Sequence, residues 1–203
     1  MNKLELIGFI RTLADGYILH PDQLVIELVD VPGASEKFVR LDAEATDKAR
    51  LIGRNGKHFR ALGTLISMFA KQCGEKVRLL HLDLPAQPER GDRYPKFKID
   101  ADWPIETMRA IVEQTVNNCL DTAHVWVEIV QLTKADSAIA IHVSPQRDGG
   151  KAIRDFKEAA EVLFGAIATG MGQRVSVSVV DDLNDKNQRR KHAAAGARKT
   201  EQT

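Results

Sequence analysis

The sequence predicts an α+β fold made of two tandem units, each with the element order αββααβ. Hydrophobic residues recur at helical and then at strand spacing on both sides of a proline-rich segment in the middle of the chain. The second half then repeats the hydrophobic pattern of the first half. With 203 residues, the chain is long enough for two domains of about 80–100 residues each.

The first unit, residues 1–84, is predicted from local spacing. Residues 3–19 carry apolar side chains on one helical face, and Pro21 then prevents the helix from continuing. The run over 24–30 is rich in β-branched and apolar residues and predicts a strand, and after a Pro-Gly turn the run over 37–42 predicts a second strand that pairs with the first as a hairpin. The remaining elements are a helix over 45–52, a helix over 57–73 and a strand over 77–83.

A linker over residues 85–98 separates this unit from the second, at 99–183. The stretch from Pro85 to Pro95 interrupts both helical and strand periodicity with prolines and charged residues, as a semi-extended linker does. The second unit is predicted to contain a helix from 104 to 120, strands over 125–132 and 138–143, a helix over 150–169 and a strand over 175–180.

The two units can be aligned by hand. Ile52 aligns with Ile153, but beyond this point Gly74 aligns with Gly172, at an offset that is shorter by three residues. The missing residues fall on Gly53-Arg54-Asn55-Gly56 of the first unit. We therefore expect the second unit to be a degenerate copy that lacks this loop. Because the copy folds without the loop, a purely structural reason for its glycines looks weak.

The Gly-x-x-Gly loop is the strongest candidate for a binding site. Two glycines remove the Cβ atoms that would keep another backbone away. The helix that starts after the loop directs its free N–H groups and the positive end of its dipole toward the same place. These features predict a seat for a sugar-phosphate backbone. The candidate residues are Ile52, Gly53, Arg54, Asn55, Gly56, Lys57, His58 and Arg60.

Composition and motifs argue against catalysis. The histidines have no metal-ligand spacing, and the sequence contains neither a P-loop nor a dinucleotide or nucleophile-elbow motif. Cys73 and Cys119 lie on apolar faces of predicted helices, as buried small hydrophobic residues do. We expect a protein that is not an enzyme, with no catalytic residues, no cofactor and no metal.

The termini and the charge distribution add three expectations. The longest apolar runs are shorter than the ~18 residues that span a bilayer, and the N-terminus is unlike a signal peptide, so we expect a cytoplasmic protein without a membrane partner. Residues 184–203 are polar and basic and predict a disordered tail. The tail acts either as a solubilising segment or as an electrostatic arm. Its basic residues are Lys186, Arg189, Arg190, Lys191, Arg198 and Lys199.

The first 84 residues resemble a KH domain, specifically the small bacterial KhpA/YlqC-type RNA-binding proteins. The resemblance is carried by the αββααβ order, the motif Leu51-Ile52-Gly53-Arg54-Asn55-Gly56-Lys57 and the closing stretch Gly74-Glu75-Lys76-Val77-Arg78-Leu79. It implies the type II KH fold, a three-stranded sheet backed by helices. The second unit then looks like a KH-like domain without the loop.

The resemblance also implies a function. A KH domain holds about four nucleotides of single-stranded RNA in a groove clamped by the GxxG loop. Gly53 and Gly56 would let the RNA approach, Arg54 and Asn55 would face phosphates, and Lys57, His58 and Arg60 would support them. Ile52 and the strand around Phe38–Arg40 would form the apolar floor and edge. RNA metabolism, ribosome assembly, translation control and other post-transcriptional regulation are the processes that this resemblance suggests.

Two alternatives remain open from the sequence. No residue is a specific reader of the ribose 2′-hydroxyl, so single-stranded DNA is a possible ligand beside RNA. The second unit could instead bind a protein partner, form a homodimer or pack on the first unit as a pseudo-dimer. In that case the protein would be an interaction or scaffold module, and nucleic-acid binding would be secondary.

Overall fold

A computed structural model describes residues 3–80, 105–131, 136–145, 150–170 and 174–181. The predicted linker over 85–98 and the predicted tail over 184–203 lie outside the described residues. In the part of the chain that is described, no helix is both long enough and apolar enough to cross a membrane.

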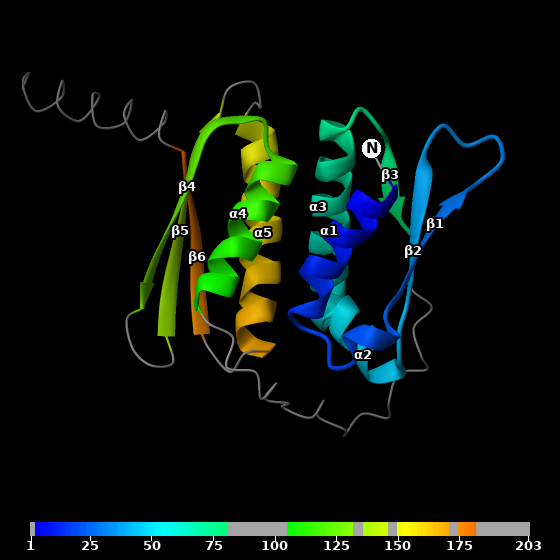
Figure 1. The fold of residues 1–203 in the computed structure, drawn as a ribbon, viewed down its shortest axis with the longest axis horizontal. Coiled ribbons are helices and arrows are strands. Elements are labelled where there is room, and N and C mark those ends of the chain that lie inside the picture. The colour runs from blue at the N-terminus through cyan, green and yellow to red at the C-terminus, as the bar shows by residue number, and fades with distance from the viewer. Residues whose placement is uncertain (1–2, 81–104, 132–135, 146–149, 171–173, 182–203) are drawn as a thin grey trace, which may run out of the picture.

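The first half folds in the predicted order αββααβ (Figure 1). Strand β1 pairs with β2 as an antiparallel hairpin, and β2 pairs with β3 in parallel, so β2 is the central strand. A 3₁₀ turn over Arg54–Gly56 separates the second helix from the third. The elements are α1 (Lys3–Asp15), β1 (Val25–Asp30), β2 (Lys37–Asp42), α2 (Ala45–Ile52), α3 (Lys57–Gln72) and β3 (Val77–Leu79).

Helix α1 ends at Asp15, which is earlier than the sequence predicted. Tyr17 and Ile18 are nevertheless buried, because the turn after α1 places them in the core. Their spacing in the sequence therefore continued the helical pattern although they lie outside the helix. The buried carboxylate of Asp47 fixes this turn, because it accepts hydrogen bonds from the backbone amides of Leu19 and His20 at 2.7 and 2.8 Å. A side chain from α2 therefore holds the segment that follows α1.

The second half also forms a three-stranded sheet, in the order β4-β5-β6, with the same sequence of antiparallel and parallel pairing. The predicted order αββααβ is wrong here, because the described elements run αββαβ. Only residues 146–149 separate β5 from α5, too few for a helix as long as α2 and a loop. The elements are α4 (Ile105–Cys119), β4 (Thr122–Gln131), β5 (Asp136–Pro145), α5 (Gly150–Gly170) and β6 (Arg174–Asp181).

Among the described residues, the second half has one helix fewer than the first because it lacks the Gly-x-x-Gly loop. In the first half, Gly53 and Gly56 break the chain into two helices, whereas α5 runs through the aligned position at Ile153 without interruption. The shared topology is consistent with a degenerate copy. Whether the second half is such a copy stays a prediction.

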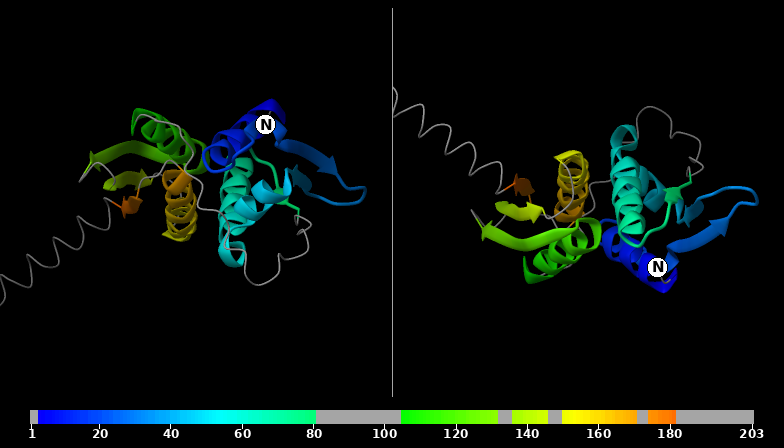
Figure 2. Two further views of the ribbon diagram at one scale, coloured as in Figure 1. Left: turned by 90° about the horizontal axis from the view of Figure 1, so that it is seen from below. Right: turned by 90° about the horizontal axis from the view of Figure 1, so that it is seen from above.

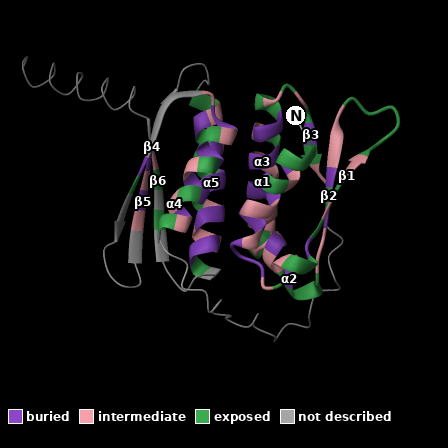
Figure 3. Cartoon of the chain, viewed as in Figure 1, coloured by how far each residue is buried: buried purple, intermediate pink, exposed green. Residues whose placement is uncertain are grey.

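The helices of the two halves pack against each other, so the molecule has the layers sheet, helices, helices, sheet (Figures 1 and 2). Helix α3 contacts α5 and α4, and α1 contacts α4. The facing sides of α3 and α5 are buried (Figure 3), and both halves contribute to one hydrophobic core. The thiol of Cys119 donates a hydrogen bond to the backbone oxygen of Leu65 at 3.5 Å across this interface.

Candidate nucleic-acid interface

The Gly-x-x-Gly loop has a backbone that only glycine and asparagine adopt readily. The N–H of Gly53 donates to the carbonyl oxygen of Ala49 at 2.9 Å and closes α2, while Gly53 itself takes φ 68° and ψ 173°. Asn55 (φ 57°) and Gly56 (φ 70°) are left-handed, a conformation in which asparagine is several-fold enriched among non-glycine residues. The N–H of Gly56 donates to the oxygen of Gly53 at 3.0 Å and closes the turn.

His58 lies under this turn rather than on its outer surface. Its Nδ1 is 2.7 Å from the carbonyl oxygen of Arg50, and its ring makes an edge-on contact with Tyr17 at 5.6 Å between centroids. A Cβ atom added at Gly53 would lie 2.4 Å from the ring carbon Cγ. The His58 ring therefore occupies the space that any side chain at position 53 would need.

This geometry corrects one inference from the sequence. The absence of the loop from the second half suggested that its glycines serve the ligand alone. The structure supplies two local reasons for Gly53, its positive φ and the ring of His58. At Gly56 the positive φ is the main constraint, since the nearest atom to an added Cβ would be Nη1 of Arg60 at 3.9 Å.

Four polar residues of the predicted site are exposed on or just after the loop, namely Arg54, Asn55, Lys57 and Arg60. Among the described residues, none of the three cations in this set has an ion-pair partner. Helix α3 starts at Lys57, and its N-cap residue, Gly56, supplies no side-chain cap, so the first N–H groups and the positive end of the helix dipole face the same region. The region attracts anions.

The basic residues just before the loop bind other groups of the protein. Lys48 forms an ion pair with Asp42 at 2.7 Å, and this partner holds the pKa of the Asp42 carboxyl below its usual value. The guanidinium of Arg50 donates to the carbonyl oxygen of Tyr17 at 3.1 Å. The basic residues from Lys48 to Arg60 therefore divide into cations in α2 that are paired within the protein and exposed cations at the loop.

The sequence predicted an apolar floor and edge for the site at Ile52 and the strand around Phe38–Arg40, and this stays a prediction. Ile52 is half-buried and packs on the core. The strand around Phe38–Arg40 is β2, the centre of the sheet, and β3 is the strand at the edge beside α3. The would-be Cβ of Gly63 in α3 lies 3.6 Å from the Cβ of Leu79 in β3, so this helix and the edge strand are in close contact.

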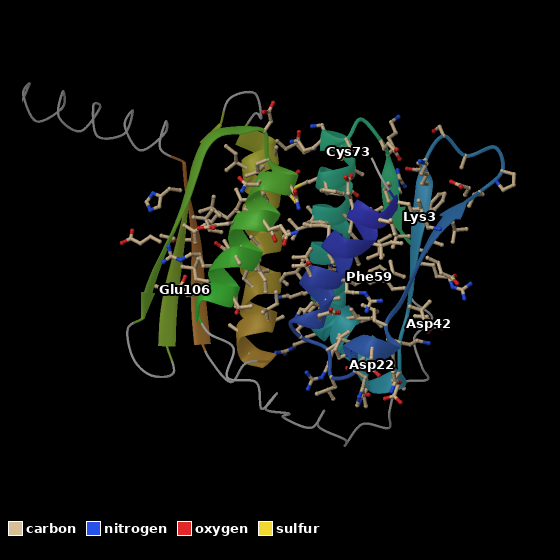
Figure 4. All side chains as sticks on the ribbon, in the orientation of Figure 1. Lys3, Asp22, Asp42, Phe59, Cys73 and Glu106 are labelled. Carbon is tan, nitrogen blue, oxygen red and sulfur yellow. The ribbon has the colours of Figure 1, made fainter. Side chains whose placement is uncertain are left out.

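A groove of about 840 Å³ follows this contact. Its floor is one side of α3, one wall is β3, and the other wall is formed by the first two turns of α5. Side chains from α3 and α5 lie close together in this region (Figure 4). The polar and charged residues that line the groove are Arg60, Thr64, Ser67, Lys71, Gln72, Arg78, Lys151 and Asp155.

The structure brings the predicted residues 52–60 together at one end of this groove, where Arg60 belongs to both the loop and the lining. Sequence reasoning missed Lys71 and Lys151. The polar residues Arg60, Thr64, Ser67 and Lys71 recur at helical spacing, and this stripe was the available signal for Lys71. No local pattern pointed to Lys151, because it comes from the other half of the chain.

The comparisons with known proteins agree with the geometry of the first half. No curated protein matches the chain. Residues 8–80 match the family model described as KhpA/KhpB, KH domain. This range begins within α1, ends just after β3 and contains the whole Gly-x-x-Gly loop. KH domains bind single-stranded RNA in general and are a non-catalytic kind of domain. Residues 8–80 therefore resemble a KH domain both in this match and in the order αββααβ.

Proposed function

We propose that the protein binds single-stranded RNA without catalysis and clamps about four nucleotides at the Gly-x-x-Gly loop. The observation that carries this proposal is the turn over residues 53–56, with Arg54 and Asn55 exposed, with no side-chain cap on the helical N–H groups, and with nearby cations that have no ion-pair partner in the described part of the chain. Its role in the cell would then lie in RNA metabolism, ribosome assembly or translation control.

Each residue would act through its position. Gly53 and Gly56 present backbone without side chains, so a phosphate can approach the turn closely. Arg54, Asn55 and Lys57 are exposed and can donate hydrogen bonds to phosphate oxygens. His58 would act indirectly by supporting the turn from below. If about three phosphates are neutralised, affinity should fall with salt at a log–log slope near −2.

The test is the double variant Arg54→Asp with Asn55→Asp in the full-length protein. Fluorescence anisotropy with a short single-stranded RNA should show complete loss of binding, because two acidic groups would then face the phosphates. The melting temperature should stay nearly unchanged, since both side chains are exposed and asparagine and aspartate both tolerate the left-handed backbone.

A matched control carries the same change in charge away from the loop. Lys157→Glu with Gln114→Glu alters two exposed helical positions in the second half. This control should bind RNA like the unmodified protein. RNA binding that survives the loop double variant would refute the loop as the site. A parallel titration with DNA of the same sequence would separate RNA from single-stranded DNA.

The alternative function is an interaction module in which the second half binds a protein partner. The packing of α4 and α5 on α1 and α3 agrees with the pseudo-dimer form of this alternative, and it leaves these helix faces covered within the chain. Under this alternative, the loop double variant would lose RNA affinity without losing the function of the protein in cells.

A further inference from the structure

We propose that the second half of the chain contributes directly to the RNA path, through Lys151 in the first turn of α5. The inference rests on the proposed function, since it extends the RNA beyond the loop. The strand would run from the Gly-x-x-Gly turn along α3 and reach α5 at the far end of the groove. The binding site would then be shared by both halves of the protein.

The loop and the groove are continuous. Arg60 lines the groove, and its Nη1 lies 3.9 Å from the position that a Cβ of Gly56 would take. One guanidinium therefore belongs both to the loop and to the lining. A phosphodiester chain held at Gly56 would already be at the entrance of the groove.

The groove is long enough for several nucleotides. The groove lining includes α3 residues from Arg60 to Lys71, which at 1.5 Å per residue is about 16 Å along the helix axis. At about 3.4 Å per stacked nucleotide, this distance accommodates roughly five nucleotides, and fewer when the strand is extended. An RNA that is longer than the segment clamped by the loop would therefore meet the far end.

The far end of the groove carries exposed cations. Lys71 and Lys151 are exposed at the end where α5 begins, and neither has an ion-pair partner among the described residues. Arg78 is already paired with Glu36 at 2.8 Å, so it is a weaker candidate. Among the described residues that line the groove, Asp155 is the one acidic residue. The lining of the groove therefore carries a net positive charge, which attracts the phosphate backbone of RNA.

Small and apolar residues form the surface between these cations. Gly63, Thr64 and Ser67 are small, and the half-buried side chains of Met68 and Leu79 lie beside them. Small residues leave room for an RNA backbone, while the hydroxyls of Thr64 and Ser67 already donate to the carbonyl oxygens of Arg60 and Val77 at 3.0 Å. Half-buried apolar side chains can contact bases. The groove is thus suited to a single strand along its whole length.

The experiment compares RNAs of four and ten nucleotides on the full-length protein, with the variants Lys151→Gln and Lys157→Gln. Removal of one phosphate contact should weaken binding of the ten-nucleotide RNA about five-fold at 0.1 M salt and reduce the log–log salt slope by about 0.7. The four-nucleotide RNA should bind Lys151→Gln normally. Lys157 is exposed on α5 outside the groove lining, so Lys157→Gln should bind both RNAs normally.

The outcomes separate this inference from the proposed function. Equal affinities of Lys151→Gln and Lys157→Gln for the ten-nucleotide RNA would overturn the extended path, while loss of binding in the loop double variant would still support the loop. An equal loss for both RNA lengths would also overturn it, because that result would indicate a general charge effect. Failure of the unmodified protein to bind either RNA would overturn both proposals.

Discussion

Substitution of Gly53 by alanine tests how the loop is built. The backbone at Gly53, with φ 68° and ψ 173°, lies in a region that is essentially restricted to glycine, and a residue with a Cβ there costs about 1–3 kcal/mol. The added Cβ would also lie 2.4 Å from Cγ, 2.6 Å from Nδ1 and 2.8 Å from Cδ2 of His58. The ring would have to move.

Movement of the ring adds a second cost. It would break the 2.7 Å hydrogen bond between Nδ1 and the oxygen of Arg50, which is worth about 0.5–1.5 kcal/mol. The total loss of unfolding free energy for Gly53→Ala should be about 2–4 kcal/mol. Gly56→Ala is the matched control, because its left-handed backbone costs about 1–2 kcal/mol and its Cβ would make only an ordinary contact, with Nη1 of Arg60 at 3.9 Å.

Urea unfolding followed by circular dichroism measures both variants, together with His58→Ala and the double variant Gly53→Ala with His58→Ala. Once the ring is absent, the alanine at position 53 should cost about 0.5–1.5 kcal/mol less, which is the coupling in the double-mutant cycle. A penalty at Gly53 no larger than that at Gly56, or strictly additive effects in the cycle, would refute the account of His58 as the support beneath the loop.

Two further predictions concern the core and the interface. Asp47→Ala should lower the unfolding free energy, measured by urea unfolding, by about 2–4 kcal/mol, because the amides of Leu19 and His20 lose their acceptor. The control is Asp22→Ala at an exposed position, and an equally small loss for both variants would contradict this role of Asp47. Burial raises the pKa of the Cys119 thiol, so in the native protein Cys119 should react with a thiol reagent roughly ten-fold or more slowly than the half-buried Cys73. Each rate is measured with the other cysteine changed to serine. Equal rates would indicate that the two halves separate readily.

Features that depend on neighbouring residues were predictable from the sequence. The hairpin of β1 and β2, the helices α2 and α3, and the glycine stop at Gly74 all follow from local spacing and from backbone preferences. The position of the loop was predictable for the same reason, since the Gly-x-x-Gly motif lies between two helical patterns. The resemblance to a KH domain rested on these local features, and the family match covers the same region.

Sequence spacing failed where a distant contact decides the local structure. The pattern in α1 continued past Asp15, but Asp47 from α2 captures the following amides and holds a turn. The order αββααβ was expected for the second half as well, but there α5 runs without the helix break that Gly53 and Gly56 produce in the first half. In both cases apolar spacing reports burial and does not report which backbone conformation achieves it.

The sequence by itself determined where the KH domain lies, which order its elements take and where its loop interrupts them, because each of these depends on residues adjacent in the chain. Only the tertiary structure decided that His58 supports Gly53 from below, that β3 is the edge strand and that the first turns of α5 form a wall of the groove. The physical reason is that sheet order and helix packing bring together residues whose spacing in sequence carries no periodic signal, as with Arg60 and Lys151.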